Sequence, residues 1–199
     1  QNNGTRNLGE INTNDNFVIS GNLENYSVMN IGGLLSTNNL LNTGSLKAVD
    51  KIYTSGVSFN NSGEILTTLL DINNTGILNT NKITVIDNAR LNGSNVTNNG
   101  YISGTNIEII TAGLTNTGTL AADELIKANN TTINNTGYIG SNSKVNLSGS
   151  NLTNSGTIES SEIELYNMSG YNNTSLIRGG NVSLTTTGNL TLTGTLHGE

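Results

Sequence analysis

The chain has 199 residues, of which 33% are hydrophobic and 4% aromatic, so it has little material for a conventional globular core. Cysteine is absent, which excludes a disulfide framework and thiolate metal sites. The net charge of -6 and the scattered placement of the eight Lys and Arg residues argue against nucleic acid as a partner.

Polar residues dominate the composition, so disorder is the first alternative to consider. Against it, Leu, Ile and Val recur at fixed offsets, and a disordered chain has no reason to keep such a register. No stretch has the eighteen apolar residues of a membrane-spanning helix, and no signal segment opens the chain. The first residue is not methionine, and the last residues stop within the pattern. We therefore expect a piece of a longer protein.

The first part of the chain shows the pattern least clearly. Apolar patches at Phe17–Ile19 and Val28–Ile31 predict strands with a blurred period. We expect a single segment over residues 1–199, with less regular coils over 1–41 and regular repeats over 42–194.

A short phrase of the form Asn-x-Gly recurs from Asn42 onward. From Gly100 the glycines follow one another after 18, 19 and 19 residues, which is the signature of a repeat. Between Gly63 and Gly100 the phrase is uneven, because Gly76 divides the 37 residues into 13 and 24. The spacing predicts one short and one long coil there, with the excess around Asn88–Asn95 bulging outward, or else a boundary phrase that is displaced from its corner.

Apolar residues occupy fixed places in each repeat and predict about three short strands per coil. Within the middle strand they alternate with polar residues, which points one row of side chains inward. No window has helical periodicity, and Asn, Gly and Thr are poor helix formers. Two residues after each phrase the chain carries Ile102, Leu120, Ile139, Ile158 and Leu176.

Short strands of this kind bury a core only when coils stack at about 4.8 Å and pair with one another. The pattern therefore predicts an all-β fold, a parallel β-helix (β-solenoid) with coils of about 19 residues. About ten such coils would make a rod roughly 50 Å long.

The Asn-x-Gly phrase is interpreted as a structural corner. Glycine supplies a positive φ without steric cost, and stacked Asn amides can bond along the axis. A ligand-binding amide row is the alternative, but binding sites are local and this phrase recurs in every coil. The expected ladder comprises Asn42, Gly44, Asn61, Gly63, Asn98, Gly100, Asn116, Gly118, Asn135, Gly137, Asn154, Gly156 and Asn172.

The sequence offers little for catalysis, and we expect no catalytic residue, metal site or cofactor. His197 is the one histidine, and the Gly-Gly-x-Gly-x-Asp pattern of calcium-binding β-rolls is absent. The acids are densest at Asp123-Glu124 and at Glu159, Glu162 and Glu164. Glu124 and Glu162 each follow their glycine by six residues, which places them roughly 10 Å apart, near the upper limit for the acid pair of an inverting glycosidase. A carbohydrate-active β-helix, with polysaccharide lyase or hydrolase activity, is therefore the alternative function.

Units such as Asn135–Thr153 resemble the filamentous haemagglutinin repeats of two-partner-secretion exoproteins. The shared form is Asn-x-Gly-x-Ile/Leu, then x-Ile/Val-x-Leu/Ile, then Leu-x-Asn. The resemblance implies a right-handed parallel β-helix, exported by an outer-membrane β-barrel transporter and secreted to the cell surface of a Gram-negative bacterium. It also implies a structural or adhesive shaft of a surface fibre, found in adhesins, haemagglutinins and contact-dependent inhibition stalks. The partner of such a fibre would be a host-cell or bacterial surface receptor or glycan.

A third possibility is a receptor-binding segment in which irregular coils present their outward side chains. The candidate binding loops carry Asn88, Arg90, Asn92, Asn95, Tyr166 and Tyr171.

Overall fold

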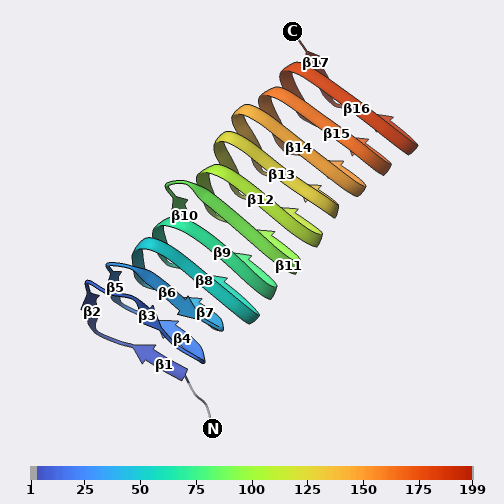
Figure 1. The fold of residues 1–199 in the computed structure, drawn as a ribbon. Coiled ribbons are helices and arrows are strands. Elements are labelled where there is room, and N and C mark those ends of the chain that lie inside the picture. The colour runs from blue at the N-terminus through green and yellow to red at the C-terminus, as the bar shows by residue number, and fades with distance from the viewer. Residues whose placement is uncertain (1–3, 199) are drawn as a thin grey trace.

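The computed structural model describes residues 4–198, with the side chains of 130, 131 and 167 excepted. Over this part of the chain the fold is all β, without helix, and winds as a parallel β-solenoid of about ten turns (Figure 1). Coils stack with roughly 19 residues between paired strands. The fold predicted from the repeat is confirmed. Residues 1–3 and 199 of the predicted segment lie outside the described residues.

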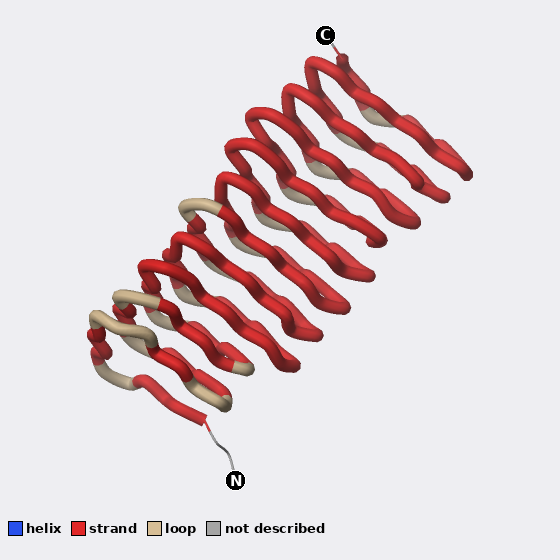
Figure 2. The backbone as a smooth tube through the Cα atoms, viewed as in Figure 1, coloured by secondary structure: helices blue, strands red, loops and turns tan. Residues whose placement is uncertain are grey.

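Strands in the first coils are short and separated by turns, whereas later strands run almost around the whole coil (Figure 2). The short ones are β1 (Gly4–Asn7), β2 (Glu10–Thr13), β3 (Phe17–Val18), β4 (Asn22–Asn25), β5 (Val28–Ile31), β6 (Leu34–Thr37) and β7 (Asn39–Asn42). The remaining strands are β8 (Ser45–Asn61), β9 (Glu64–Asn79), β10 (Lys82–Val85), β11 (Asn88–Asn98), β12 (Tyr101–Asn116), β13 (Thr119–Asn135), β14 (Tyr138–Asn154), β15 (Thr157–Asn173), β16 (Leu176–Leu192) and β17 (Thr195–Gly198).

The register divides the solenoid into three faces. Face 1 begins with β1, β4 and β7, which pair in that order. Face 2 begins with β2 and β5, and face 3 with β3 and β6. Strand β8 pairs with β5, β6 and β7 in turn, so it covers all three faces within one coil. Each coil thus has three strand segments, as the apolar offsets predict.

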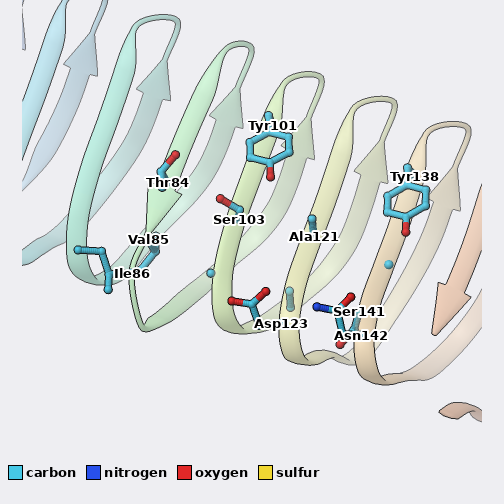
Figure 3. A pocket seen from close by; sticks show the side chains of 13 residues that line it. Thr84, Val85, Ile86, Tyr101, Ser103, Ala121, Asp123, Tyr138, Ser141 and Asn142 are labelled. Carbon is cyan, nitrogen blue, oxygen red and sulfur yellow. The ribbon is translucent and has the colours of Figure 1, made fainter. Parts of the chain in front are cut away.

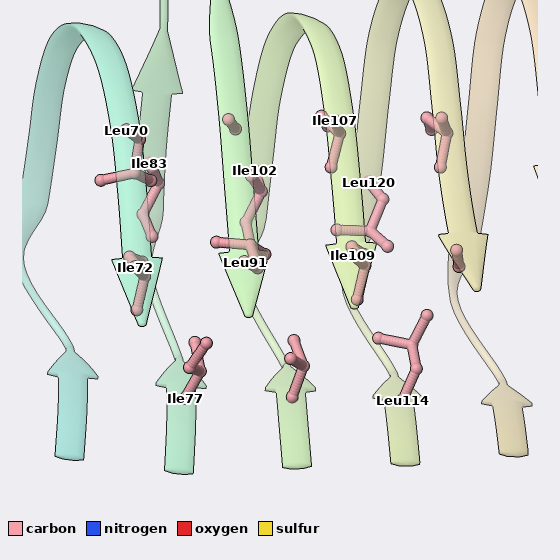
Figure 4. Close-up of a cluster of buried hydrophobic side chains, with 14 of the residues drawn as sticks. Leu70, Ile72, Ile77, Ile83, Leu91, Ile102, Ile107, Ile109, Leu114 and Leu120 are labelled. Atoms are coloured by element: carbon pink, nitrogen blue, oxygen red, sulfur yellow. The ribbon is translucent and has the colours of Figure 1, made fainter. Parts of the chain in front are cut away.

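Inward side chains of successive coils form columns of Leu, Ile and Val, as Figure 4 shows for the middle of the solenoid. In one column Ile83, Ile102 and Leu120 are partners in neighbouring coils, and each is at most 1% exposed. Burying one such side chain stabilises the fold by about 1.5–3 kcal/mol. Because every coil adds to the same columns, the low hydrophobic content is sufficient for a continuous core.

Of the two interpretations of the stretch between Gly63 and Gly100, the displaced boundary phrase is confirmed, and the short and long coils with an outward bulge are wrong. The corner between these two glycines is Asn79-Thr80-Asn81, because Asn79 pairs with Asn61 below and Asn98 above, at separations of 18 and 19 residues. Gly76 lies on face 1, where it pairs with Asn95. Residues 88–95 therefore belong to a regular strand, β11, and do not bulge outward.

Candidate functional site

A continuous asparagine ladder runs along the corner that follows face 1. Each Nδ2 donates to the Oδ1 of the asparagine one coil further toward the C-terminus, at 2.7–2.9 Å. The amides are at most 4% exposed, and Nδ2 donates further to backbone carbonyls of its own and the next coil. Buried amides are stable only when bonded in this way. The members are Asn7, Asn25, Asn42, Asn61, Asn79, Asn98, Asn116, Asn135, Asn154 and Asn173.

Asn172 is not a member of the ladder, and its assignment was wrong by one residue. Asn154 pairs with Asn173, whose Oδ1 accepts the bond, while Oδ1 of Asn172 has no hydrogen-bond partner within residues 4–198. The predicted ladder also omits Asn79, and it omits Asn7 and Asn25 in the less regular first part of the chain. The errors at Asn79 and Asn173 arise because glycine marks the corner in the predicted phrase, and these two corners carry Asn81 and Ser175 in its place. From Asn25 onward, the buried apolar residue two positions before each ladder asparagine, such as Ile77 before Asn79, is the signal that locates it.

The corner glycines are required for close stacking and not for a positive φ. None of Gly44, Gly63, Gly100, Gly118, Gly137 and Gly156 adopts a left-handed φ, contrary to expectation. Instead, a Cβ on Gly137 would lie 2.1 Å from the carbonyl oxygen of Gly118 in the coil below. The same clash, at 1.9–2.1 Å, occurs at the other five.

Corners that carry a larger residue stack less tightly. After a glycine corner, the next amide bonds to the coil below at 2.7–2.9 Å, as for Tyr101 and Tyr138. After Asn81 and Ser175 the equivalent distances, from Lys82 N and Leu176 N, are both 3.4 Å. The added Cβ therefore lengthens a hydrogen bond between coils.

A column of alternating charge crosses face 3, in which Asp71, Arg90, Glu108 and Lys127 are partners in register. Lys51 reaches Asp71 diagonally, because its own register partner is Leu69. Asp71 lies between Lys51 and Arg90, at 2.8 and 3.5 Å, and Glu108 lies between Arg90 and Lys127, at 3.6 and 3.5 Å. The side chains are about one-quarter to two-fifths exposed, so each pair contributes little stability. A coil displaced by one residue would lose every one of these pairs, which makes the column a device for register.

The two acids considered for catalysis do not share a column. In register, Glu162 pairs with Lys144, and Lys144 pairs with Leu125. Leu125 therefore occupies the column of Glu162, and Glu124 lies one position before that column. Lys144 Nζ contacts Glu164 at 2.8 Å and Glu162 at 3.2 Å. The hydrogen bond to Lys144 lowers the pKa of Glu164, and the same bond raises the pKa of Lys144.

The residues expected in binding loops are divided between the surface and the core. Asn88 and Asn95 are exposed and Arg90, Asn92 and Tyr166 are half-buried, all within regular strands. The structure does not bring Tyr166 together with the others.

Tyr171, a candidate binding residue from the sequence, belongs to the core. It is 2% exposed, in the column that contains Leu152 and Leu190. Its hydroxyl has no hydrogen-bond partner among the described residues, and burial raises its pKa far above the ordinary value.

Face 2 carries a feature that the sequence did not reveal, an open groove along the solenoid axis (Figure 3). One hollow of about 460 Å³ crosses the coils of β10, β12, β13 and β14. A second hollow, of about 430 Å³, continues the first along the axis and shares Tyr138 with it. A third, of about 520 Å³, lies beside the first at the corner before face 2 and shares Tyr101 with it. The three hollows form one surface, here named the tyrosine groove. It contains Lys82, Tyr101, Ser103, Ala121, Asp123, Tyr138, Gly140, Asn142, Glu159 and Arg178.

The groove exists because one outward column has small side chains. Ser103, Ala121 and Gly140 pair in register across three coils and form its floor. In the next coils the same column carries Glu159 and Arg178, which form an ion pair. Outward positions have no packing partner that constrains them, so no periodic pattern signals such a column.

Tyr138 lies along the strand surface above Gly140. A Cβ at position 140 would lie 2.2 Å from the Tyr138 hydroxyl and 2.3 Å from its Cζ. Burial, and then the charge of Glu159, raise the pKa of Tyr138. The phenol is therefore protonated at neutral pH and can donate a hydrogen bond.

Within residues 4–198 no group of three or more His, Asp or Glu side chains could hold a metal ion. No helix in this part of the chain is suited to crossing a membrane. Comparison with protein-family models, curated proteins and solved structures found no match.

Proposed function

We propose that this chain is a structural shaft, a segment of a fibre secreted to the surface of a Gram-negative bacterium. The observation that carries the proposal is the asparagine ladder, which passes through nine consecutive coil-to-coil steps without interruption. A structure that repeats one set of bonds in every coil gains length with each repeat and needs no central site.

The charged residues support the same role. Six of the eight Lys and Arg residues pair with an acid in a neighbouring coil, so most cations of the chain connect coils. The six are Arg6, Lys51, Arg90, Lys127, Lys144 and Arg178.

Export in an unfolded state fits the composition. The absence of cysteine removes disulfides that would obstruct passage, and coils that pair only with their neighbours can fold one after another outside the cell. With the resemblance to filamentous haemagglutinin repeats, this favours an outer-membrane β-barrel transporter as the export partner.

The test joins the chain to the secretion domain of a two-partner-secretion exoprotein and expresses it in a Gram-negative host with the cognate transporter. Protease added to intact cells should digest the segment only when the transporter is present. A segment that stays protected within cells despite an active transporter would contradict export. Electron microscopy of the purified 199-residue chain should show straight rods, and compact particles would contradict the shaft.

A carbohydrate-active enzyme remains the alternative, since Asp123 and Glu159 lie in the tyrosine groove. The chain would be incubated with polysaccharides and assayed for new reducing ends or unsaturated products. Turnover by the wild type that is lost in Asp123→Asn or Glu159→Gln would replace the shaft proposal by an enzymatic one.

A further inference from the structure

We infer that the tyrosine groove binds an extended, neutral oligosaccharide along the solenoid axis. The inference rests on the proposed function only in that a fibre outside the cell meets glycans. It adds the ligand class and the residues that hold it.

The shape of the groove indicates a linear ligand. Two hollows follow one another along face 2 and share Tyr138, Ser141 and Asn142, while a third lies beside the first at the corner that carries Tyr101. The two tyrosines are two coils apart in register, because both pair with Thr119, which gives a separation of roughly 10 Å. That distance is close to the length of a disaccharide, so consecutive pairs of sugar rings would meet equivalent surfaces.

The side chains have the chemistry that recognises sugars. Tyr101 is 40% exposed and Tyr138 lies down over Gly140, so both offer an apolar ring with a polar tip. Sugar rings have apolar faces of C–H groups and polar edges of hydroxyls. Asp123 and Asn142 stand exposed beside the floor and can accept or donate hydrogen bonds to such hydroxyls.

The charges of the groove cancel. It contains two cations, Lys82 and Arg178, and two anions, Asp123 and Glu159, and the Glu159–Arg178 pair is already formed. A sulfated or uronate-rich glycan would need an excess of cations, which the groove does not have. A neutral glycan meets no such requirement.

A peptide is a poorer fit than a glycan. Peptides that bind sheets usually add a strand to a free edge, whose backbone groups are unpaired. In the groove the strands of face 2 already pair with the coils on both sides, from β10 to β16. The face therefore offers side chains, and a ligand rich in hydroxyls suits it better than a backbone.

The test is a glycan array with the 199-residue chain, followed by calorimetric titration of the neutral oligosaccharides that bind. Tyr138→Ala and Tyr101→Ala should each weaken affinity by about tenfold. Tyr26→Ala is the matched control, because Tyr26 is 41% exposed and lies outside the groove, and it should bind as the wild type does. Circular dichroism and thermal unfolding would verify that each variant is folded.

A second pair of variants adds bulk and leaves the tyrosines in place. Ala121→Trp fills the floor and should abolish binding, whereas Thr153→Trp, at an exposed position of face 1, should not. Preference for acidic glycans, absence of neutral ligands, or binding that survives both Tyr138→Ala and Ala121→Trp would overturn the inference. None of these results affects the shaft proposal, which depends on rod shape and surface export.

Discussion

The phenol of Tyr138 occupies the space that a side chain at Gly140 would need, since a Cβ there would lie 2.2 Å from its hydroxyl. Gly140→Ala should therefore displace the ring into solvent. The obstacle is the end of a flexible side chain, so we expect a stability loss below about 1 kcal/mol. Because burial is the main cause of the raised Tyr138 pKa, that pKa should fall toward the ordinary value. Titration of the tyrosines by NMR would measure it, and an unchanged pKa would contradict the proposed arrangement.

Gly118 differs from Gly140 because its obstacle is backbone. A Cβ on Gly118 would lie 1.9 Å from the carbonyl oxygen of Gly100, which cannot move without separating the coils. Gly118→Ala should reduce the free energy of unfolding by about 1–3 kcal/mol in denaturant titrations.

Gly76→Ala is the control for that substitution. The nearest atom to a Cβ at Gly76 is 3.8 Å away, so this variant should be as stable as the wild type or more stable, by up to about 1 kcal/mol. Equal losses in Gly118→Ala and Gly76→Ala would show that close stacking at the corner is not the reason for its glycine.

Asn116 lies in the middle of the ladder, where it bonds to Asn98, Asn135 and the backbone of Tyr138. Asn116→Ala removes these bonds and leaves the Asn135 oxygen unpaired, so we expect a loss of about 2–4 kcal/mol. Asn99→Ala, at an exposed position of the same corner, should cost less than about 0.5 kcal/mol. The two variants would be compared by urea unfolding, and a similar cost for both would refute the ladder's contribution.

Tyr171 should affect stability mainly at high pH. Its folded pKa is raised above the ordinary value of 10.0, so its contribution is fully present below pH 10 and decreases as the pH rises beyond it. Tyr171→Phe should abolish this part of the alkaline loss, which has a slope of about 1.4 kcal/mol per pH unit.

At neutral pH the same variant should be unchanged or more stable by up to about 1 kcal/mol, since the hydroxyl has no partner among the described residues. Unfolding curves at several pH values would measure both effects. A loss above 1 kcal/mol at pH 7 would reveal a hydrogen bond of the phenol.

The charge column on face 3 should set register more than stability. Glu108→Gln removes the acid between Arg90 and Lys127, and the loss should stay below about 1 kcal/mol because the pairs are partly exposed. Glu108→Lys places three cations in consecutive coils and should cost more at low salt than at high salt. Unfolding at two ionic strengths would measure the difference, and equal losses at both would exclude an electrostatic cause.

Much of the fold was predictable because stacking forces the same side chain into the same place in each coil. Ile102, Leu120 and Ile139 are partners in register, and their constant offset is visible in the sequence. Between Gly63 and Gly100 the sequence leaves uneven coils and a displaced phrase as alternatives, because Asn74-Thr75-Gly76 imitates the corner phrase. It lies at a different corner, where the Asn74 amide donates to Asn38.

The tyrosine groove was not predictable in this way. Its floor depends on three small outward residues from different coils, and each alone is unremarkable in the sequence. Tyr101 and Tyr138 share one column, but that column also contains Thr119, so no repeated aromatic motif points to it.

The asparagine ladder has a direction, because every Nδ2 donates toward the C-terminal coil. The aligned amides give the stack a polarity, with acceptors facing one way and donors the other. Two such stacks could extend one another only head to tail. Within one chain, the Nδ2 group of each coil presents the same hydrogen-bond donor to the next coil. Insertions or deletions should therefore be tolerated best when they comprise whole coils.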